Sequence, residues 1–354
     1  MLVQSSRPRS PALTAEPLPE PKVAVLLNAN AKKVTDKVIH RVSHVVPEED
    51  LFVSRQLSDC ERIARQVVDR RYSTVFTGGG DGTFMAFVNA INAELAARRI
   101  ARPPRFGVLK LGTGNSLANL VGASGLSGDG ILDDILRARA NEVPSVRRLE
   151  MLTCEGRMAP FAGLGYDAAL LNDYNALKKV AKVAKPLVET QAGYLMALGL
   201  KTIPHYMVNP TPIQAEIVAE GRAMKLGPDG KATQIYASGD VLFRGGLNVI
   251  AASTVPCYGF NFKMFPFVGK RRGMFQLRAS SVSTLACVAN LPSLWKGHWR
   301  HPAIHDFMVE GATIRLERPM PLQIGGDAEG ERESLSLGLA EKSFDLVDFT
   351  AALN

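Results

Sequence analysis

The composition of the chain is that of a folded protein large enough for two domains. It has 354 residues, of which 46% are hydrophobic and 21% are charged. The net charge of +8 favours an anionic partner such as a nucleotide or a membrane surface, although a solubilising surface explains the same charge. The four cysteines lie far apart and have no ligand spacing, which argues against a zinc site or a disulfide framework. Because neither a membrane span nor a signal peptide is evident, we expect a cytoplasmic protein.

The first part of the chain is expected to be a leader followed by an α/β domain. Residues 1–21 are rich in Pro, Ser, Arg and Glu and have no periodicity, which predicts disorder. From there to residue 143, short apolar runs alternate with helical patterns, and this alternation predicts a doubly wound domain with a parallel sheet. The expected strands are 23–27, 51–54, 73–76 and 106–109. The expected helices are 34–46, 58–71 and 84–98.

A glycine-rich turn links the third strand to its helix. Its sequence, Thr77-Gly78-Gly79-Gly80-Asp81-Gly82-Thr83, gives a backbone free to take positive φ and to approach a ligand closely. The following helix N-terminus suits a phosphate. A carboxylate there repels phosphate unless a metal intervenes, so Asp81 is interpreted as a partner of a metal or of a substrate hydroxyl. The alternative is an ordinary turn in which Asp81 caps the helix.

A second glycine loop follows the fourth strand and opens another helix. It runs Lys110-Leu111-Gly112-Thr113-Gly114-Asn115-Ser116. Because the carboxyl ends of parallel strands meet at one edge of a sheet, the two glycine loops are expected to lie side by side there.

The remainder of the chain, 144–335, is predicted to be a β-rich domain. Strands are expected at about 146–154, 161–165, 211–218, 233–239, 246–253, 274–281, 305–317 and 321–325, and helices at about 167–185, 190–203 and 283–296. A lysine-rich face within 167–185 and the aromatic and basic segment 258–272 fit either a solvated surface and core or contact with lipid. Residues 336–354 are expected to form a C-terminal segment that can return to the first domain.

Three motifs in this order resemble the catalytic domain of the diacylglycerol kinase and sphingosine kinase superfamily, in a bacterial-type member. Gly78 to Thr83 is similar to its GGDGT motif, Gly112 to Asn115 to its LGTGN motif, and Gly163 to Ala168 to its GxGxDA segment. The resemblance covers about residues 22–335. It implies a Rossmann-like domain that carries ATP, a C-terminal antiparallel β-sandwich, and a cleft between them in which ATP phosphorylates a lipid hydroxyl with Mg²⁺.

The same resemblance implies site residues. Nucleotide contacts are expected from Asn28, Ser54, Gly78, Gly79, Gly80, Asp81, Gly82, Thr83, Gly112, Thr113 and Asn115, with Asp81 as the metal ligand. The superfamily has a catalytic base in a DGE motif, and an ungapped match places Gly325-Gly326-Asp327 there. Asp327 is then the base, whereas a shifted match makes it Glu329. Gly325 replaces the motif's Asp, and Arg272-Gly273 departs from the Asp-Gly of members that carry a structural Mg²⁺, so that second metal site is expected to be absent.

Three functions remain open at this point. The first is an ATP-dependent lipid kinase acting on a diacylglycerol-like or long-chain-base-like substrate. The second is a nucleotide- or lipid-binding protein with impaired catalysis, and the third is a kinase of a soluble substrate such as NAD. A lipid substrate implies peripheral contact with a membrane. No nucleic acid is expected as a partner, and a homodimer is possible.

Overall fold

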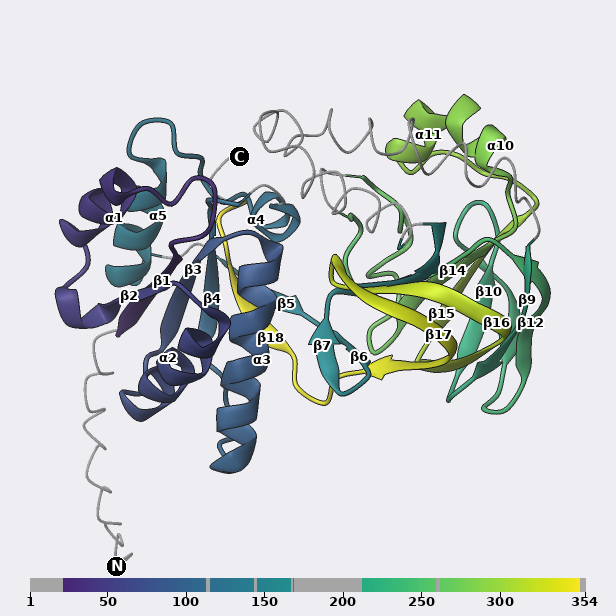
Figure 1. The fold of residues 1–354 in the computed structure, drawn as a ribbon, viewed down its shortest axis with the longest axis horizontal. Helices are drawn as coiled ribbons and strands as arrows, with labels where there is room; N and C mark the ends of the chain where they lie inside the picture. The colour runs from purple at the N-terminus through teal and green to yellow at the C-terminus, as the bar shows by residue number, and fades with distance from the viewer. Residues whose placement is uncertain are drawn as a thin grey trace, which may run out of the picture.

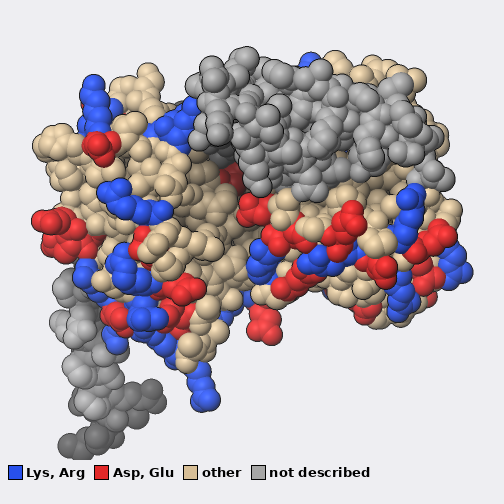
Figure 2. Space-filling model, in the orientation of Figure 1, with Lys and Arg blue, Asp and Glu red and all other residues tan. Residues whose placement is uncertain are grey.

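The protein contains two sheets that lie side by side, each with its own arrangement of strands (Figure 1). This computed structural model describes residues 22–112, 115–142, 145–166, 168, 212–258 and 262–350. The leader, the helices expected at 167–185 and 190–203, and the end of the C-terminal segment therefore lie outside the described residues. Acidic and basic side chains intermingle over both domains on the face shown in Figure 2.

The first sheet has six strands in the order β2-β1-β3-β4-β18-β5. The first five are parallel to one another, and β5 is antiparallel to its neighbour β18. The strands are β1 Val23–Asn28, β2 Leu51–Ser54, β3 Thr74–Gly79, β4 Arg105–Lys110, β5 Ser145–Leu149 and β18 Phe344–Asp348. The four strands expected before residue 110 are thus confirmed, and the runs of the central strands β1 and β3 are buried on both faces of the sheet.

Helices cover both faces of this sheet. They are α1 Asp36–Ser43, α2 Leu57–Asp69, α3 Asp81–Ala97, α4 Ser116–Leu120 and α5 Gly130–Arg139, with a 3₁₀ turn at Glu48–Asp50. Alternate residues of β1 divide between two cores: Val25 packs with α1 and α5, whereas Leu26 packs with α2 and α3. This division follows from the period of two along a strand and confirms the doubly wound arrangement.

The chain crosses between the sheets twice. It leaves the first sheet after Leu149 and enters the second at Leu152, and it returns between Leu339 and Phe344. The expected division at residue 143 therefore precedes the crossing, because β5 still pairs with β18 of the first sheet. The run expected as one strand at 146–154 is two strands, one in each sheet.

The second sheet is antiparallel and has twelve strands. They are β6 Leu152–Cys154, β7 Arg157–Ala159, β8 Phe161–Gly165, β9 Ile213–Ala219, β10 Ala223–Leu226, β11 Ala232–Tyr236, β12 Val241–Leu247, β13 Val249–Ser253, β14 Phe275–Ser280, β15 Ile304–Val309, β16 Gly311–Ile324 and β17 Asp327–Leu339. The expected fold class, a Rossmann-like domain followed by an antiparallel β domain, is confirmed. The strand hydrogen bonds join the β domain into one branched sheet, in which β9 bridges β12 and β16.

Local expectations in the second domain need correction. The strand expected at 246–253 comprises the end of β12 and all of β13, and the strand expected at 321–325 is the end of β16. The helix expected at 283–296 is two short helices, α10 Thr284–Ala289 and α11 Leu291–Trp295, and Pro292 lies in the first turn of the second helix. The strand expected at 305–317 is divided at Glu310 into β15 and β16, because the chain turns there to pair Gly311 with β17. Among the described residues, no helix is long and apolar enough to cross a lipid bilayer.

Candidate active site

The carboxyl ends of β1 and β3 form the point at which the first sheet reverses its direction of winding. The connection through α1 leads to β2 on one side of β1, and the connection through α2 leads back to β3 on the other. Ligands of open α/β sheets bind at such a point. Asn28, the last residue of β1, donates from Nδ2 to Oγ1 of Thr83 at 2.9 Å. Ser54 ends the neighbouring β2, where its carbonyl accepts from the amide of Ala29 at 2.9 Å. The predicted residues Asn28, Ser54 and Thr83 thus border one edge of the sheet.

The glycines of the turn serve close packing rather than unusual backbone angles. The turn does not use the freedom of glycine to take positive φ: Gly80, the N-cap of α3, has φ −96°, and its neighbours Gly78, Gly79 and Gly82 also have no positive φ. A Cβ on Gly78 would meet the Leu27 side chain, and one on Gly79 would meet Thr83. A Cβ on Gly82 would meet nothing within 4 Å. The first turn of α3 is therefore open at Gly82, where a ligand can approach the backbone.

The second glycine loop packs directly against the first. β3 and β4 are neighbours, and a Cβ on Gly112 would overlap the backbone of Gly80. Asn115 holds this loop in shape, because its Nδ2 donates to the Gly112 carbonyl at 2.7 Å and its Oδ1 accepts from the Gly112 amide at 3.0 Å. The two loops lie side by side as their spacing predicts. Thr113 lies outside the described residues.

Asp81 caps a helix, but not the helix that it begins. Its Oδ2 accepts from the Ser116 amide at 2.9 Å and its Oδ1 from the Leu117 amide at 3.1 Å, so the carboxylate closes the N-terminus of α4. Burial raises the pKa of Asp81, and the two amide hydrogen bonds act in the opposite direction. The side chain thereby fixes the two glycine loops relative to each other.

This arrangement does not fit a resident magnesium site. Both oxygens of Asp81 are engaged by backbone amides, and the part of the chain that the structure describes contains no group of three or more His, Cys, Asp or Glu side chains able to hold a metal. Magnesium is usually held by one or two carboxylates together with substrate phosphates. The structure thus supports a positioning role for Asp81, and the predicted role as metal ligand stays a prediction.

The candidate base lies at the tip of a β-hairpin from the second domain. Gly325 and Gly326, with φ of +60° and +94°, form the two-residue turn between β16 and β17, and Ile324 pairs with Asp327. A Cβ on Gly325 would collide with Sδ of Met85 in α3. Glycine at this position is therefore explained by the turn and by its contact with the first domain.

Asp327 shares a groove with the glycine turn. The groove has a volume of about 540 Å³ and is lined by both domains, with Gly82, Met85 and Asn89 on one side and Met158, Ile324 and Asp327 on the other. Asp327 is exposed at this surface. Glu329, the alternative base, is not among the described residues that line this groove, and its Oε1 lies 2.8 Å from Nη2 of Arg157. The geometry thus favours Asp327.

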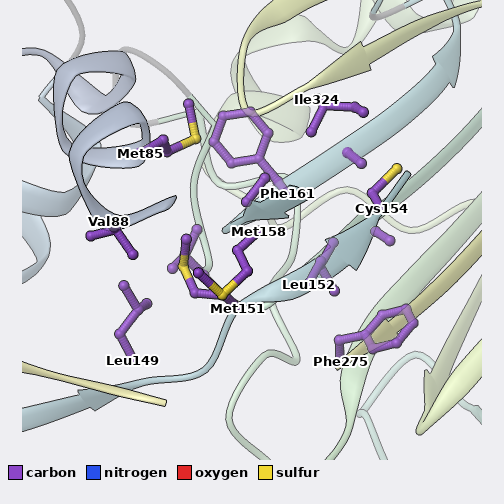
Figure 3. Packing of buried hydrophobic residues seen from close by; sticks show 14 of the residues in the cluster. Met85, Val88, Leu149, Met151, Leu152, Cys154, Met158, Phe161, Phe275 and Ile324 are labelled. Atoms are coloured by element: carbon purple, nitrogen blue, oxygen red, sulfur yellow. The ribbon is translucent and has the colours of Figure 1, made fainter. Parts of the chain in front are cut away.

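The walls of the groove are held together by a shared apolar core and a polar clamp. Figure 3 shows Met85 and Val88 of α3 facing Met158 and Phe161 of the second domain, and all four belong to one buried cluster. Within this seam, Asn89 donates from Nδ2 to the Met158 carbonyl at 2.8 Å and accepts at Oδ1 from the Met158 amide at 2.9 Å. The Asn89 side-chain amide thus forms the same pair of hydrogen bonds with Met158 that a neighbouring β-strand backbone would form, and it fixes α3 against β7.

A chain of hydrogen bonds connects the second glycine loop with the hairpin tip. Ser116 donates from Oγ to the carbonyl of Tyr258 at 2.9 Å. The Tyr258 hydroxyl accepts from Nε2 of Gln323 at 3.3 Å, and Oε1 of Gln323 accepts from the Gly326 amide at 2.9 Å. Sequence reasoning named Ser116 only as the last residue of the second glycine loop and missed Gln323. It also missed Asn89 and singled Tyr258 out only as part of an aromatic segment, because their partners are remote in sequence.

Comparison with known proteins agrees with this geometry. Residues 22–147 match the family model of the diacylglycerol kinase catalytic domain. No curated protein sequence matches the chain. A crystal structure of a candidate diacylglycerol kinase from Bacillus anthracis str. Sterne superposes with a TM-score of 0.63 at 15% identity, covering 94% of this chain and 98% of the other. A further diacylglycerol kinase structure from the same organism gives 0.58 at 13% identity, with the same coverage.

The structural likeness extends the shared fold over both domains, while the family match concerns the first domain and the start of β5. The predicted resemblance is confirmed, since both glycine loops fall within the matched residues. Residues 22–147 of the chain are therefore similar to the diacylglycerol kinase catalytic domain, and the chain shares the fold of these solved structures.

Proposed function

We propose that the protein is an ATP-dependent lipid kinase that transfers the γ-phosphoryl group to a hydroxyl of a diacylglycerol-like or long-chain-base-like lipid. One observation carries this proposal: Gly82 of the glycine turn and Asp327 of the second domain line the same groove. Phosphoryl transfer needs a cradle for phosphate and a group that takes the acceptor's proton, positioned on the two sides of the reacting phosphorus. The family match supports a kinase, and the lipid acceptor and ATP are part of the proposal.

In this proposal the two glycine loops form the nucleotide side of the groove. The open backbone at Gly82 and the N-terminus of α3 face the phosphates, since unpaired amides and the helix dipole favour negative charge there. Asn28, Ser54 and Asn115 border this edge and keep its loops in place. Because both oxygens of Asp81 bind α4, the ATP phosphates would hold any Mg²⁺, which would neutralise part of their charge.

Asp327 supplies the base on the opposite wall. Its carboxylate takes the proton of the acceptor hydroxyl while that oxygen forms a bond to the γ-phosphorus and the bond to the leaving ADP oxygen breaks. Such a general base contributes about 10²- to 10⁴-fold to the rate. The Arg157 ion pair leaves Glu329 a structural role beside the groove.

The test is transfer of radiolabel from [γ-³²P]ATP to a panel of lipids containing diacylglycerols and long-chain bases, with NAD as a soluble acceptor. Asp327→Asn is expected to lose at least about 10²-fold in turnover, whereas Glu329→Gln is expected to retain most of it. Full activity of Asp327→Asn would reject the base, and phosphorylation of NAD alone would reject the lipid acceptor. Saturable ATP binding with no transfer to any acceptor would favour an impaired binding protein.

A further inference from the structure

The helical pair α10–α11, residues 284–295, is unusual because it exposes apolar side chains and has no charge. Its sequence contains no Lys, Arg, Asp or Glu. Thr284 is its one buried residue, while 62% of Leu285 and 36% of Val288 are exposed. These two side chains lie one helical turn apart and so share a face. In Figure 1 the pair lies at the upper right of the second domain.

The chain around this pair is strongly basic. Residues 241–305 contain no Asp or Glu, but they contain eight basic residues: Arg244, Lys263, Lys270, Arg271, Arg272, Arg278, Lys296 and Arg300. Arg244 pairs with Glu216, and the buried Arg278 pairs with Asp306. The other six lie in two short segments, 263–272 and 296–300. A positive surface therefore begins where the helical pair ends.

Direct contacts join the two segments to the pair. The ring of Trp295 stacks on Phe262 at 5.2 Å, and the Trp295 carbonyl accepts from the Lys263 amide at 2.9 Å. The Arg300 guanidinium and the Lys270 ammonium each lie 5.0 Å from the centre of the Phe267 ring. Cations of both segments therefore meet on one aromatic side chain.

A small pocket extends the same surface. It has a volume of about 260 Å³, a floor that includes Met224, Leu226 and Met308, and a rim that includes Lys231, Lys270 and Arg271. Asp229 lies beside this rim, 3.6 Å from the Lys231 ammonium. An apolar floor with a predominantly basic rim matches an amphiphile that has a negative head and an apolar chain.

We infer that the helical pair α10–α11 and the basic segments 263–272 and 296–300 form a docking surface for an anionic lipid bilayer. Leu285 and Val288 enter the boundary between headgroups and acyl chains, and the flanking cations bind anionic headgroups. A nucleic acid matches the charge but offers no apolar layer for these side chains. The inference rests on the proposed function, since a bilayer would present the acceptor lipid to the groove, and it names the surface that makes the contact.

Co-sedimentation of the full-length protein with phosphatidylcholine vesicles, with and without phosphatidylglycerol, tests the inference. The protein is expected to bind the anionic vesicles and not the neutral ones. Leu285→Gln combined with Val288→Gln is expected to weaken binding by about tenfold or more. Leu136→Gln is the matched control, because Leu136 is also exposed but lies on α5 of the first domain. Lys270→Gln with Arg271→Gln is expected to weaken binding by about fivefold per charge.

A second control removes two cations elsewhere, Lys37→Gln with Arg148→Gln, and is expected to retain binding. Equal losses in both charge-removing pairs, or unchanged binding of the Leu285 and Val288 variant, would overturn the surface. Far-UV circular dichroism and thermal unfolding establish that each variant is folded, and a charge-conserving variant, Lys270→Arg with Arg271→Lys, is expected to bind as the native protein does. Transfer to a dispersed short-chain lipid separates the two proposals, because it tests the kinase without a bilayer.

Discussion

Ser116 and Tyr258 join the two domains through one hydrogen bond that belongs to the candidate site. The Ser116 hydroxyl donates to the Tyr258 carbonyl at 2.9 Å in a buried position, while the Ser116 amide donates to Asp81. One residue thus connects the carboxylate of the glycine turn with the domain that provides Asp327. Two hydrogen bonds, from the Ser116 amide to Asp81 and from the Ser116 hydroxyl to Tyr258, therefore link the glycine turn to the second domain.

Ser116→Ala is expected to lower the free energy of unfolding by about 1–3 kcal/mol, because it leaves a buried carbonyl without its donor. Turnover should fall more than the binding of ATP, since the substitution affects the position of the second domain. Ser43→Ala is the matched control: its hydroxyl donates to the His40 carbonyl at an exposed position of α1. Urea unfolding measures the stability of each variant, and kinase kinetics measure its turnover and ATP binding. Equal effects of the two substitutions would contradict the cross-domain role of Ser116.

The titration of Asp81 gives a prediction with a definite sign. Burial raises the pKa of Asp81, with the Ser116 and Leu117 amides opposing it. The folded protein then keeps this proton to a higher pH than the unfolded chain, so its contribution to stability is complete below the unfolded pKa of about 4 and is lost as pH rises through the folded pKa. Asparagine does not titrate, so Asp81→Asn lacks this pH-dependent contribution to stability. The stability advantage of the native protein over Asp81→Asn should therefore shrink as the pH rises above about 4.

Denaturant unfolding of both proteins across that range measures the difference. An advantage that grows with pH would mean that the two amide hydrogen bonds outweigh burial and lower the pKa of this carboxyl. The same series with Asp133→Asn, an exposed residue of α5, controls for general effects of pH on the two proteins.

The hairpin tip offers a test of how the domains fit together. Gly325→Ala is expected to destabilise the protein by about 1–3 kcal/mol. The alanine would have to adopt the positive φ of this position, and its Cβ would collide with the Met85 side chain. Gly326→Ala meets backbone strain without a collision, since nothing lies within 4 Å of its Cβ. A double-mutant cycle with Met85→Ala should relieve part of the Gly325→Ala cost and none of the Gly326→Ala cost. Equal relief in both would show that Met85 does not contact Gly325.

The local elements could be predicted because their signals lie within short stretches of sequence. The buried strands of the first sheet are continuous apolar runs, and the apolar residues of α2 recur at helical spacing and are buried: Cys60, Ile63, Ala64, Val67 and Val68. Strand and helix alternation then specified a parallel sheet, and the two glycine loops specified its functional edge. The same reasoning failed at 146–154, where the chain crosses from β5 in the first sheet to β6 in the second. Both stretches have the pattern of a strand, so the sequence does not mark the crossing between them.

The sequence by itself determined the order of the elements, the α/β and antiparallel β classes, the two glycine loops and the three candidate carboxylates. Tertiary structure decided what these residues do. It assigned Asp81 to the N-terminus of α4, engaged Glu329 with Arg157, and placed Asp327 in the groove with Gly82. The physical reason is distance along the chain: the bond from Ser116 to Tyr258 joins residues 142 positions apart, and its partners carry no local pattern that marks them as a pair.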